Sequence, residues 1–198
     1  MSEQSEQILI KRCKDGDLQA FEELISKYET KVFNITFRIL GDYTQAEDVS
    51  QDIMVKVFRT IKGFKEQSSF YTWLYRITVN ECMDMVKKRK RTLTYSIDSP
   101  LDTEDGEIKT EIQDSSESVE GTVERNELRR YLADAMNSLS PEHKTVIVLR
   151  DVQGFSYEEI AEIIKCPPGT VKSRINRARL ELKNLLMKNR ELFLSKSV

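Results

Sequence analysis

The sequence predicts an all-α protein with two helical domains joined by a flexible acidic linker. Apolar residues recur at helical spacing through most of the chain. No run alternates apolar and polar residues between Asn-Gly or Asp-Gly turns, as the strands of a hairpin would. Residues 94–122 are rich in Asp, Glu and Ser and show no sustained period. We therefore expect an N-terminal domain over 1–93, a linker over 94–122 and a C-terminal domain over 123–198.

Four helices are expected in the N-terminal domain, over residues 8–14, 18–40, 44–63 and about 70–91. Gly41 ends the second of these, because glycine favours the position after a helix C-terminus. Thr44 and Glu47 have the spacing of a capping box and should begin the third. Ser69 is the expected N-cap of the fourth. Trp73 and its apolar neighbours on this helix are expected to be core residues.

The C-terminal domain is expected to contain a helix over 123–138, a second helix capped by Ser140 and begun by Pro141, and a helix-turn-helix. Ser156 and Glu159 form a capping box at the start of the first helix of that motif. Residues 165–167 are its turn. Pro168 suits the first position of the second helix, where a missing amide hydrogen costs nothing.

The second helix of the motif separates apolar from basic residues. A buried stripe is predicted from residues at steps of four and three, namely Val171, Ile175, Ala178, Leu182 and Leu185. Ser173, Asn176 and Arg177 lie roughly opposite the stripe. Cations flank this face, namely Lys172, Arg174 and Arg179. Arg can bind a guanine edge, Asn an adenine, and cations the phosphates, so the helix is typical of a major-groove reader. A solvated basic face on an ordinary helical hairpin is the alternative interpretation.

The charge distribution supports a nucleic-acid partner. The net charge of −2 conceals an acidic segment, because 94–122 holds nine acidic residues and one basic residue, a charge of −8. The rest of the chain therefore carries +6, which favours binding to a polyanion. No stretch approaches the roughly 20 apolar residues of a membrane helix. The polar N-terminus has the character of neither a signal peptide nor a transit sequence.

The residue types needed for catalysis or metal binding are scarce. The three cysteines, Cys13, Cys82 and Cys166, are widely spaced and are expected to be free thiols in a reducing compartment. His143 is the only histidine. We therefore expect no catalytic residues, no metal site and no cofactor, and an enzyme is the least favoured class.

Three stretches together resemble one family, and the resemblance covers nearly the full chain. They are AEDVSQDIMVKVF at 46–58, FYTWLYRITVN at 70–80 and the helix-turn-helix. They resemble the extracytoplasmic-function (ECF) class of bacterial RNA polymerase sigma factors. The resemblance implies a sigma domain 2 at the N-terminus and a sigma domain 4 at the C-terminus, with the linker in place of the third domain of housekeeping sigma factors.

The resemblance also implies site residues. The polymerase-binding face would consist of Asp48, Gln51 and Asp52, which otherwise read as a solvated helix face. The minus-10 DNA would be held by a base-capturing loop and the helix after it, with Phe64, Ser68, Ser69, Phe70, Arg76, Asn80, Lys87 and Arg89. Lys87 and Arg89 belong to a basic run that is equally well read as a solubilising helix end. The minus-35 DNA would be read by Thr170, Lys172, Ser173, Arg174, Asn176 and Arg177.

The function implied is an alternative sigma factor that directs core RNA polymerase to particular promoters. Its expected partners are the β′ clamp helices and β flap of the polymerase, promoter DNA and an anti-sigma factor. The expected location is the bacterial cytoplasm, with the anti-sigma factor holding the protein at the membrane and no direct membrane insertion. Asn176 occupies a position that varies in the family, and the tail 187–198 is a second departure, with apolar residues that suit packing on domain 4 or a partner.

Two rival functions fit the same helices. A stand-alone helix-turn-helix transcriptional regulator would form a stable homodimer and bind an operator without polymerase. A helical interaction protein that mimics a sigma factor would bind a partner, and changes at Ser173 or Arg177 would have no effect on that binding.

Overall fold

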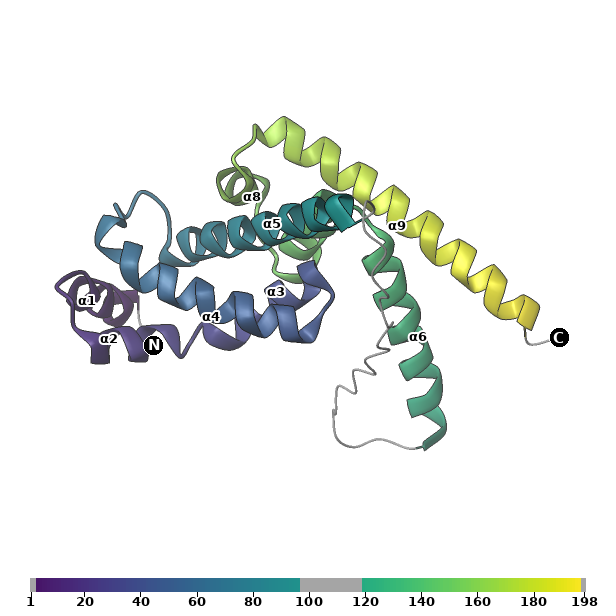
Figure 1. The fold of residues 1–198 in the computed structure, drawn as a ribbon, viewed down its shortest axis with the longest axis horizontal. Helices are drawn as coiled ribbons and strands as arrows, with labels where there is room; N and C mark the ends of the chain where they lie inside the picture. The colour runs from purple at the N-terminus through teal and green to yellow at the C-terminus, as the bar shows by residue number, and fades with distance from the viewer. Residues whose placement is uncertain (1–2, 97–118, 197–198) are drawn as a thin grey trace.

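The computed structural model describes residues 3–96 and 119–196, and within these two ranges every regular element is a helix (Figure 1). The predicted all-α fold is therefore confirmed. The elements are α1 (Glu3–Lys14), α2 (Leu18–Ile25), α3 (Glu29–Leu40), α4 (Tyr43–Thr60), a 3-10 turn η1 (Ile61–Gly63), α5 (Phe70–Ser96), α6 (Val119–Ser138), α7 (Pro141–Ile147), a π-helical turn η2 (Val148–Val152), α8 (Tyr157–Ile164) and α9 (Pro168–Lys196).

One helix predicted as continuous is divided in two. The prediction over 18–40 is wrong, because α2 ends at Ile25 and α3 begins at Glu29. In the turn between them the amide of Tyr28 donates to the carbonyl of Ile25 at 2.7 Å. The Tyr28 ring is buried against Phe70, with 5.4 Å between ring centroids, and its hydroxyl donates to Glu6 at 2.6 Å. These tertiary contacts favour the break over continued helix.

The N-cap of α4 also differs from the prediction. Thr44 and Glu47 do not form the predicted capping box, since α4 begins at Tyr43 and Asp42 is its N-cap. The Asp42 carboxylate accepts from the amide of Gln45 at 2.8 Å. Gly41 closes α3 in the left-handed conformation, with φ of 77°, and leaves Asp42 extended and able to cap.

The predicted caps of α5, α7 and α8 are confirmed. Ser69 accepts from the amide of Thr72 at 3.0 Å, and Ser140 accepts from His143 at the start of α7. At α8 the Ser156 hydroxyl accepts from the Glu159 amide at 3.1 Å, while the Glu159 carboxylate accepts from the Ser156 amide at 2.8 Å. Two amides at the helix start are thereby satisfied reciprocally.

The Ser156→Ala substitution is expected to lower the free energy of unfolding by about 1 kcal/mol, because it removes this cap. Thr44→Ala is the matched control, since Thr44 is exposed and makes no cap. Urea denaturation followed by circular dichroism measures both changes. Equal midpoints for the two variants would contradict the role of Ser156.

Helices α5 and α6 extend into the segment predicted as linker. Helix α5 continues to Ser96 and α6 begins at Val119, so 94–96 and 119–122 are helical. The exact end of a helix is difficult to predict from sequence, because charged residues occur in helices as readily as in linkers. The remainder of the predicted linker, 97–118, lies outside the described residues.

The two groups of helices share one continuous core. Helix α5 packs against α3 and α4 on one side and against α8 on another, and α3 also contacts α7. Figure 1 shows α8 beside α5, while α6 and the C-terminal half of α9 project away from the other helices. Leu74 of α5 and Leu149 of η2 are fully buried members of the same hydrophobic cluster.

The cysteines are free, and two of them are buried within this core. Burial raises the pKa of the Cys82 thiol to about 12 and also raises that of Cys13. Cys166, in the turn after α8, is partly exposed. Since the thiolate is the reactive form, we expect a thiol reagent at neutral pH to modify Cys166 first and the other two only after unfolding. Absorbance titration with an aromatic disulfide measures this, and simultaneous reaction of all three in the native protein would contradict it.

Candidate nucleic-acid interface

The helix-turn-helix has the predicted geometry. Helix α8 ends at Ile164, and Lys165 takes the left-handed conformation with φ of 52°, so the chain reverses in a tight turn. The amide of Cys166 donates to the carbonyl of Ala161 at 3.1 Å. Pro168 is the first residue of α9. The turn leads directly into the N-terminal residues of α9, the part of a recognition helix that contacts base edges in the major groove.

The N-terminal part of α9 has the predicted buried stripe, whereas Leu182 and Leu185, predicted as its continuation, are only half-buried. Val171, Ile175 and Ala178 are fully buried. The predicted minus-35 residues include four exposed side chains, Lys172, Ser173, Asn176 and Arg177, and two that are half-buried, Thr170 and Arg174. These four exposed side chains are two cations, one amide and one hydroxyl, and none of them is a carboxylate. This surface therefore offers hydrogen-bond donors to base edges and phosphates.

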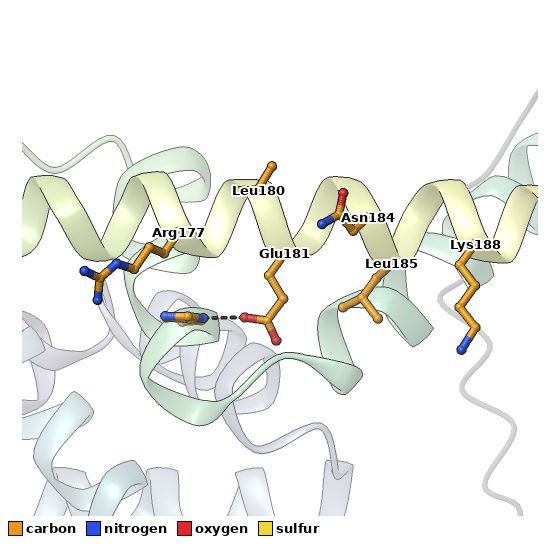
Figure 2. Close-up of a pocket in the computed structure, with 7 residues that line it drawn as sticks. Arg177, Leu180, Glu181, Asn184, Leu185 and Lys188 are labelled. Carbon is orange, nitrogen blue, oxygen red and sulfur yellow. Dashed lines mark hydrogen bonds and ion pairs between the residues drawn. The ribbon is translucent and has the colours of Figure 1, made fainter.

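Arg177 lies at the edge of this face, beside a groove between α7 and α9 (Figure 2). The groove has a volume of about 410 Å³, and its walls include Arg177, Leu180 and Glu181. Figure 2 shows Arg177 and Glu181 on one side of α9 and Leu180 on the opposite side. The Glu181 carboxylate pairs with the imidazole Nδ1 of His143, which ties α9 to α7. This contact restrains the rotation of the helix that presents Arg177.

Arg179 is held by a partner within the C-terminal helices. Its guanidinium donates to both carboxylate oxygens of Asp151, from Nε at 3.1 Å and from an Nη atom. This hydrogen bonding raises the pKa of Arg179. A bidentate Arg–carboxylate pair fixes geometry, so Arg179 serves first to position α9 against η2 and is less available to phosphates than its sequence position indicates.

A second candidate surface surrounds the loop between η1 and α5. A pocket of about 430 Å³ opens there, and its walls are Gly63, Phe64, Lys65, Gln67, Ser68, Trp73, Arg76 and Glu162. Phe64 and Trp73 form one wall, with 5.1 Å between ring centroids. Arg76 and Lys65 supply positive charge. A pocket with an aromatic wall and cations is suited to an unstacked base.

The loop residues predicted to hold a base are only partly brought together. Phe64, Ser68 and Arg76 line the pocket, whereas Ser69, Phe70 and Asn80 are not among its walls. Ser69 caps α5, and Phe70 is buried at 2% exposure against Phe64 and Trp73. These roles could not be separated from the sequence, because a polar or aromatic residue near a helix start fits a cap, a core position and a binding pocket equally well.

Five of the pocket walls, including Gly63 at the start of the loop, lie outside the residues predicted for the minus-10 site. Lys65 and Gln67 belong to the loop itself, and their polarity next to Ser68 is a signal that could have included them. Trp73 is predicted to be a core residue, and its exposure of 7% confirms that role. Its ring also forms part of the pocket wall. Glu162 comes from α8, and no pattern in the sequence connects it to this loop.

The acidic face of α4 is exposed as predicted. Asp48, Gln51 and Asp52 all face solvent. Val55 and Phe58 extend the same helix surface with apolar atoms, at 48% and 39% exposure. Apolar and acidic groups together on one exposed helix face suit a protein partner. Sequence reasoning assigned only the polar part, because Val55 and Phe58 fit equally well with a core role.

The C-terminal half of α5 carries the predicted basic patch. Lys87 and Arg89 are exposed, and Lys87 pairs with Asp84 at 3.3 Å. Arg89 also lines a pocket between the two groups of helices, and Lys144 is another of its walls. Lys144 is buried at 5% exposure, donates to Asn137 at 3.0 Å, and burial lowers the pKa of its ammonium group.

The described residues contain neither a metal-binding cluster nor a membrane-spanning helix. No group of three or more His, Cys, Asp or Glu side chains in the described ranges is arranged to hold a metal ion. In those same ranges no helix combines the length and the apolar character needed to cross a bilayer.

The chain is similar to known proteins over almost its whole length. Residues 24–92 match the family model for Sigma-70 region 2, and residues 129–182 match the one for Sigma-70 region 4. It is 38% identical to the ECF RNA polymerase sigma-E factor of Haemophilus influenzae, over 93% of this chain and 97% of the relative. It is 37% identical to the ECF RNA polymerase sigma-E factor of Escherichia coli (strain K12), over 93% and 96%.

Solved structures agree in fold. The sigma factor RpoE of Bartonella quintana, in complex with the anti-sigma factor NepR, superposes with a TM-score of 0.66 at 27% identity, over 84% of this chain and 96% of that chain. CnrH in complex with the cytosolic domain of CnrY, at 23% identity, has the same fold with a TM-score of 0.65, over 93% and 98%. The two family models and the sigma-E relatives together show that the chain belongs to the ECF class of RNA polymerase sigma factors.

Proposed function

We propose that this chain is an alternative sigma factor that binds core RNA polymerase and directs it to promoters with a particular minus-10 and minus-35 element. Residues 1–93 serve as sigma domain 2, residues 94–122 connect the domains, and residues 123–198 serve as sigma domain 4. Its role is regulatory, because the chemistry of transcription belongs to the polymerase. The observation that carries the proposal is the exposed face of α9, with donors to DNA and no carboxylate.

The minus-35 element is read by α9. Lys172 and Arg174 neutralise phosphates, while Ser173, Asn176 and Arg177 face base edges. An arginine binds guanine through two donors, and asparagine binds adenine in the same way. The pairs His143–Glu181 and Asp151–Arg179 support this assignment, because they hold α9 in one orientation relative to α7 and η2.

The minus-10 element is opened and held by the loop before α5. An extracted base enters the pocket beside Phe64 and Trp73, with Ser68 and Gln67 available to its edge and Arg76 and Lys65 to its phosphate. Because Phe64 and Phe70 are buried, the base meets the edge of the aromatic cluster and does not insert between free rings. Lys87 and Arg89 on α5 hold the neighbouring backbone, which adds affinity and salt dependence without sequence information.

Core polymerase docks on α4, where Asp48, Gln51 and Asp52 receive basic side chains of the β′ clamp helices. Val55 and Phe58 add apolar contact area. Domain 4 meets the β flap. An anti-sigma factor holds the protein inactive in the cytoplasm, in a membrane-linked complex. The solved complex of the Bartonella relative with an anti-sigma factor supports a partner of this class.

Run-off transcription tests the proposal. Purified core polymerase is supplied with a library of promoter fragments, with and without this chain, and promoter-specific transcripts are expected only with it. Asp52→Ala is expected to reduce them about 5- to 30-fold, because loss of a charged interface contact costs about 1–2 kcal/mol. Glu23→Ala, at an exposed position on α2, is the matched control and is expected to change nothing.

Two results would contradict the proposal. The first is an absence of transcripts together with specific shifts of duplex DNA by the chain alone, which would favour a stand-alone regulator. The second is a normal yield of transcripts with Asp52→Ala, which would place the polymerase contact elsewhere.

A further inference from the structure

A cavity of about 320 Å³ lies between the two groups of helices. Its walls come from α3, α4 and α5 on one side and from α6, α7 and the turn between them on the other. None of these residues lines the loop pocket or belongs to the exposed face of α9. This cavity, the seam pocket, is therefore distinct from both surfaces that read bases, and Arg89 is its one wall residue predicted to contact DNA.

The seam pocket is basic. Its walls include three cations, Arg89, Lys90 and Lys144, and no carboxylate. Arg89 and Lys90 are exposed on α5, whereas Lys144 on α7 is buried. Cations therefore reach the cavity from two helices that contact each other. Their combined field favours an anion in the space that they share.

Lys144 is a buried cation without an acidic partner among the described residues. It is 5% exposed, and its Nζ donates to Oδ1 of Asn137 at 3.0 Å. This is its one hydrogen bond within the described ranges. An ammonium group has three N–H donors, so donors remain for a further partner. A buried charge is costly without an opposite charge, and an anion in the pocket would supply one.

The amide that meets Lys144 is held in place by the backbone of the other group of helices. Gly41, after α3, takes φ of 77°, a conformation that is readily accessible to glycine. A Cβ atom at this position would lie 2.8 Å from Oδ1 of Asn137, so the close approach requires glycine. The Asn137 oxygen is thereby kept against the Lys144 ammonium, and the cation is positioned before any ligand arrives.

We propose that the seam pocket binds a small anion that carries a diphosphate group. Its phosphate oxygens accept hydrogen bonds from Lys144 at the buried end and from Arg89 and Lys90 at the exposed end. Arginine binds phosphate through paired donors and lysine binds it as a point charge. Three cations match a diphosphate better than a single phosphate, whose charge near pH 7 is about −2. Neither promoter reading nor polymerase binding uses such a ligand, so this inference goes beyond the proposed function.

The other walls indicate the rest of the ligand. Leu40, Met85 and Leu139 are apolar walls, and Gln45 contributes an amide. An inorganic ion would leave the apolar walls uncovered, whereas a diphosphate ester of an organic group would cover them. The volume of the cavity is at the low end of the roughly 300–1,000 Å³ of small-molecule sites. The expected ligand is therefore a small diphosphate ester, for which a nucleoside diphosphate is a suitable probe.

Binding in the seam pocket couples the ligand to the stability of the chain. The cations of the site come from α5 and α7, so the site exists only when both helices are folded and in contact. A ligand that binds the folded chain and not the unfolded one stabilises the folded chain by mass action. The thermal midpoint of unfolding should therefore rise with the concentration of ligand.

Isothermal titration calorimetry of the full chain tests the site, with inorganic pyrophosphate and ADP as separate probes. A salt concentration of about 150 mM screens weak attraction to the exposed surface. Saturable binding of one anion per chain is expected. Thermal unfolding followed by circular dichroism should show a higher midpoint with the same probes, and it also checks that each variant is folded.

Lys144→Met is the test variant, because it keeps most of the length of the side chain and removes its charge. We expect the affinity for both probes to fall about tenfold or more, since charge-assisted hydrogen bonds are the strong ones. Arg89→Gln is a second variant at an exposed position and should weaken binding by less, about threefold. Lys88→Met is the matched control, because Lys88 is an exposed cation next to Arg89 and is not a wall of the pocket. Its affinity should change by less than about twofold.

The results distinguish the site from general attraction of anions to a basic surface. Weaker binding in Lys144→Met with unchanged binding in Lys88→Met supports the site. Tighter binding of ADP than of pyrophosphate then identifies an organic diphosphate as the ligand, and equal binding identifies the diphosphate group alone.

Three results overturn the proposal. The first is an absence of saturable binding by both probes, and the second is equal affinity in Lys144→Met and the unmodified chain. If Lys144→Met does not fold, the third is equal affinity in Arg89→Gln and Lys88→Met. None of these measurements uses polymerase or DNA, so failure of the anion site is distinguishable from failure of the proposed function.

Discussion

Replacement of Arg177 by alanine is expected to reduce transcription from a cognate promoter by about 5- to 150-fold, because a bidentate contact to a base is worth about 1–3 kcal/mol. Arg177 is exposed, and the contact between Glu181, four residues further along α9, and His143 restrains the helix that carries Arg177. Run-off yield at several salt concentrations measures the effect. The loss should be largest on the cognate minus-35 sequence, and discrimination at one base pair should relax.

Lys183→Ala is the matched control for Arg177→Ala. Lys183 is an exposed cation on the same helix, more than one turn beyond Arg177 and outside the predicted reading face. It should leave sequence preference unchanged and lower affinity only slightly. If Arg177→Ala instead weakened binding to all sequences equally and reduced the salt dependence, Arg177 would be a phosphate contact, and the assignment of base reading to it would be wrong.

Replacement of Leu74 by alanine is expected to lower the free energy of unfolding by about 2–5 kcal/mol, through lost burial and the cavity left behind. Leu74 is completely buried in α5, the helix that packs against α3, α4 and α8. Urea denaturation followed by circular dichroism measures the change. Since domains of this size are stable by about 5–15 kcal/mol, a large fraction of the stability should be lost.

Val55→Ala is the control for this substitution, because Val55 on α4 is 48% exposed. Its effect should stay within about 0.5 kcal/mol. Similar losses for the two variants would mean that Leu74 is not in a closely packed core. A reduced slope of the denaturation curve for Leu74→Ala would indicate that the two groups of helices had begun to unfold separately.

Most helix caps were predictable from the sequence, with the exception of the capping box at Thr44, and tertiary contacts were not. The caps at Ser69, Ser140 and Ser156 follow from side chains that bond their own neighbours, so a short window contains the necessary information. The break before Tyr28 depends on Phe70 and Glu6, which are distant in sequence. Apolar residues keep helical spacing across that break, so periodicity alone predicts one helix.

In the candidate site too, features within one element were predictable and features that depend on distant segments were not. Helical periodicity identified the exposed face of α9, because its buried stripe and its basic residues belong to one element. One wall of the loop pocket is Glu162 of α8. The sequence around an exposed glutamate on a helix does not indicate which other segment of the chain it lies beside. Phe64 and Phe70 illustrate a further limit, since an aromatic residue near a loop fits stacking and core packing equally well until its neighbours are known.

The shared core has a consequence for the lifetime of the protein in the cell. When the domains separate, Phe155 and the surface around Tyr71 lose their cover, and each half keeps a smaller core of its own. Small cores give marginal stability, and proteases act on whatever fraction of molecules is unfolded. Polymerase or a partner that binds the opened chain protects it by mass action. We expect unbound molecules that open to be degraded faster than closed or polymerase-bound ones, so that turnover limits how long an unused sigma factor persists.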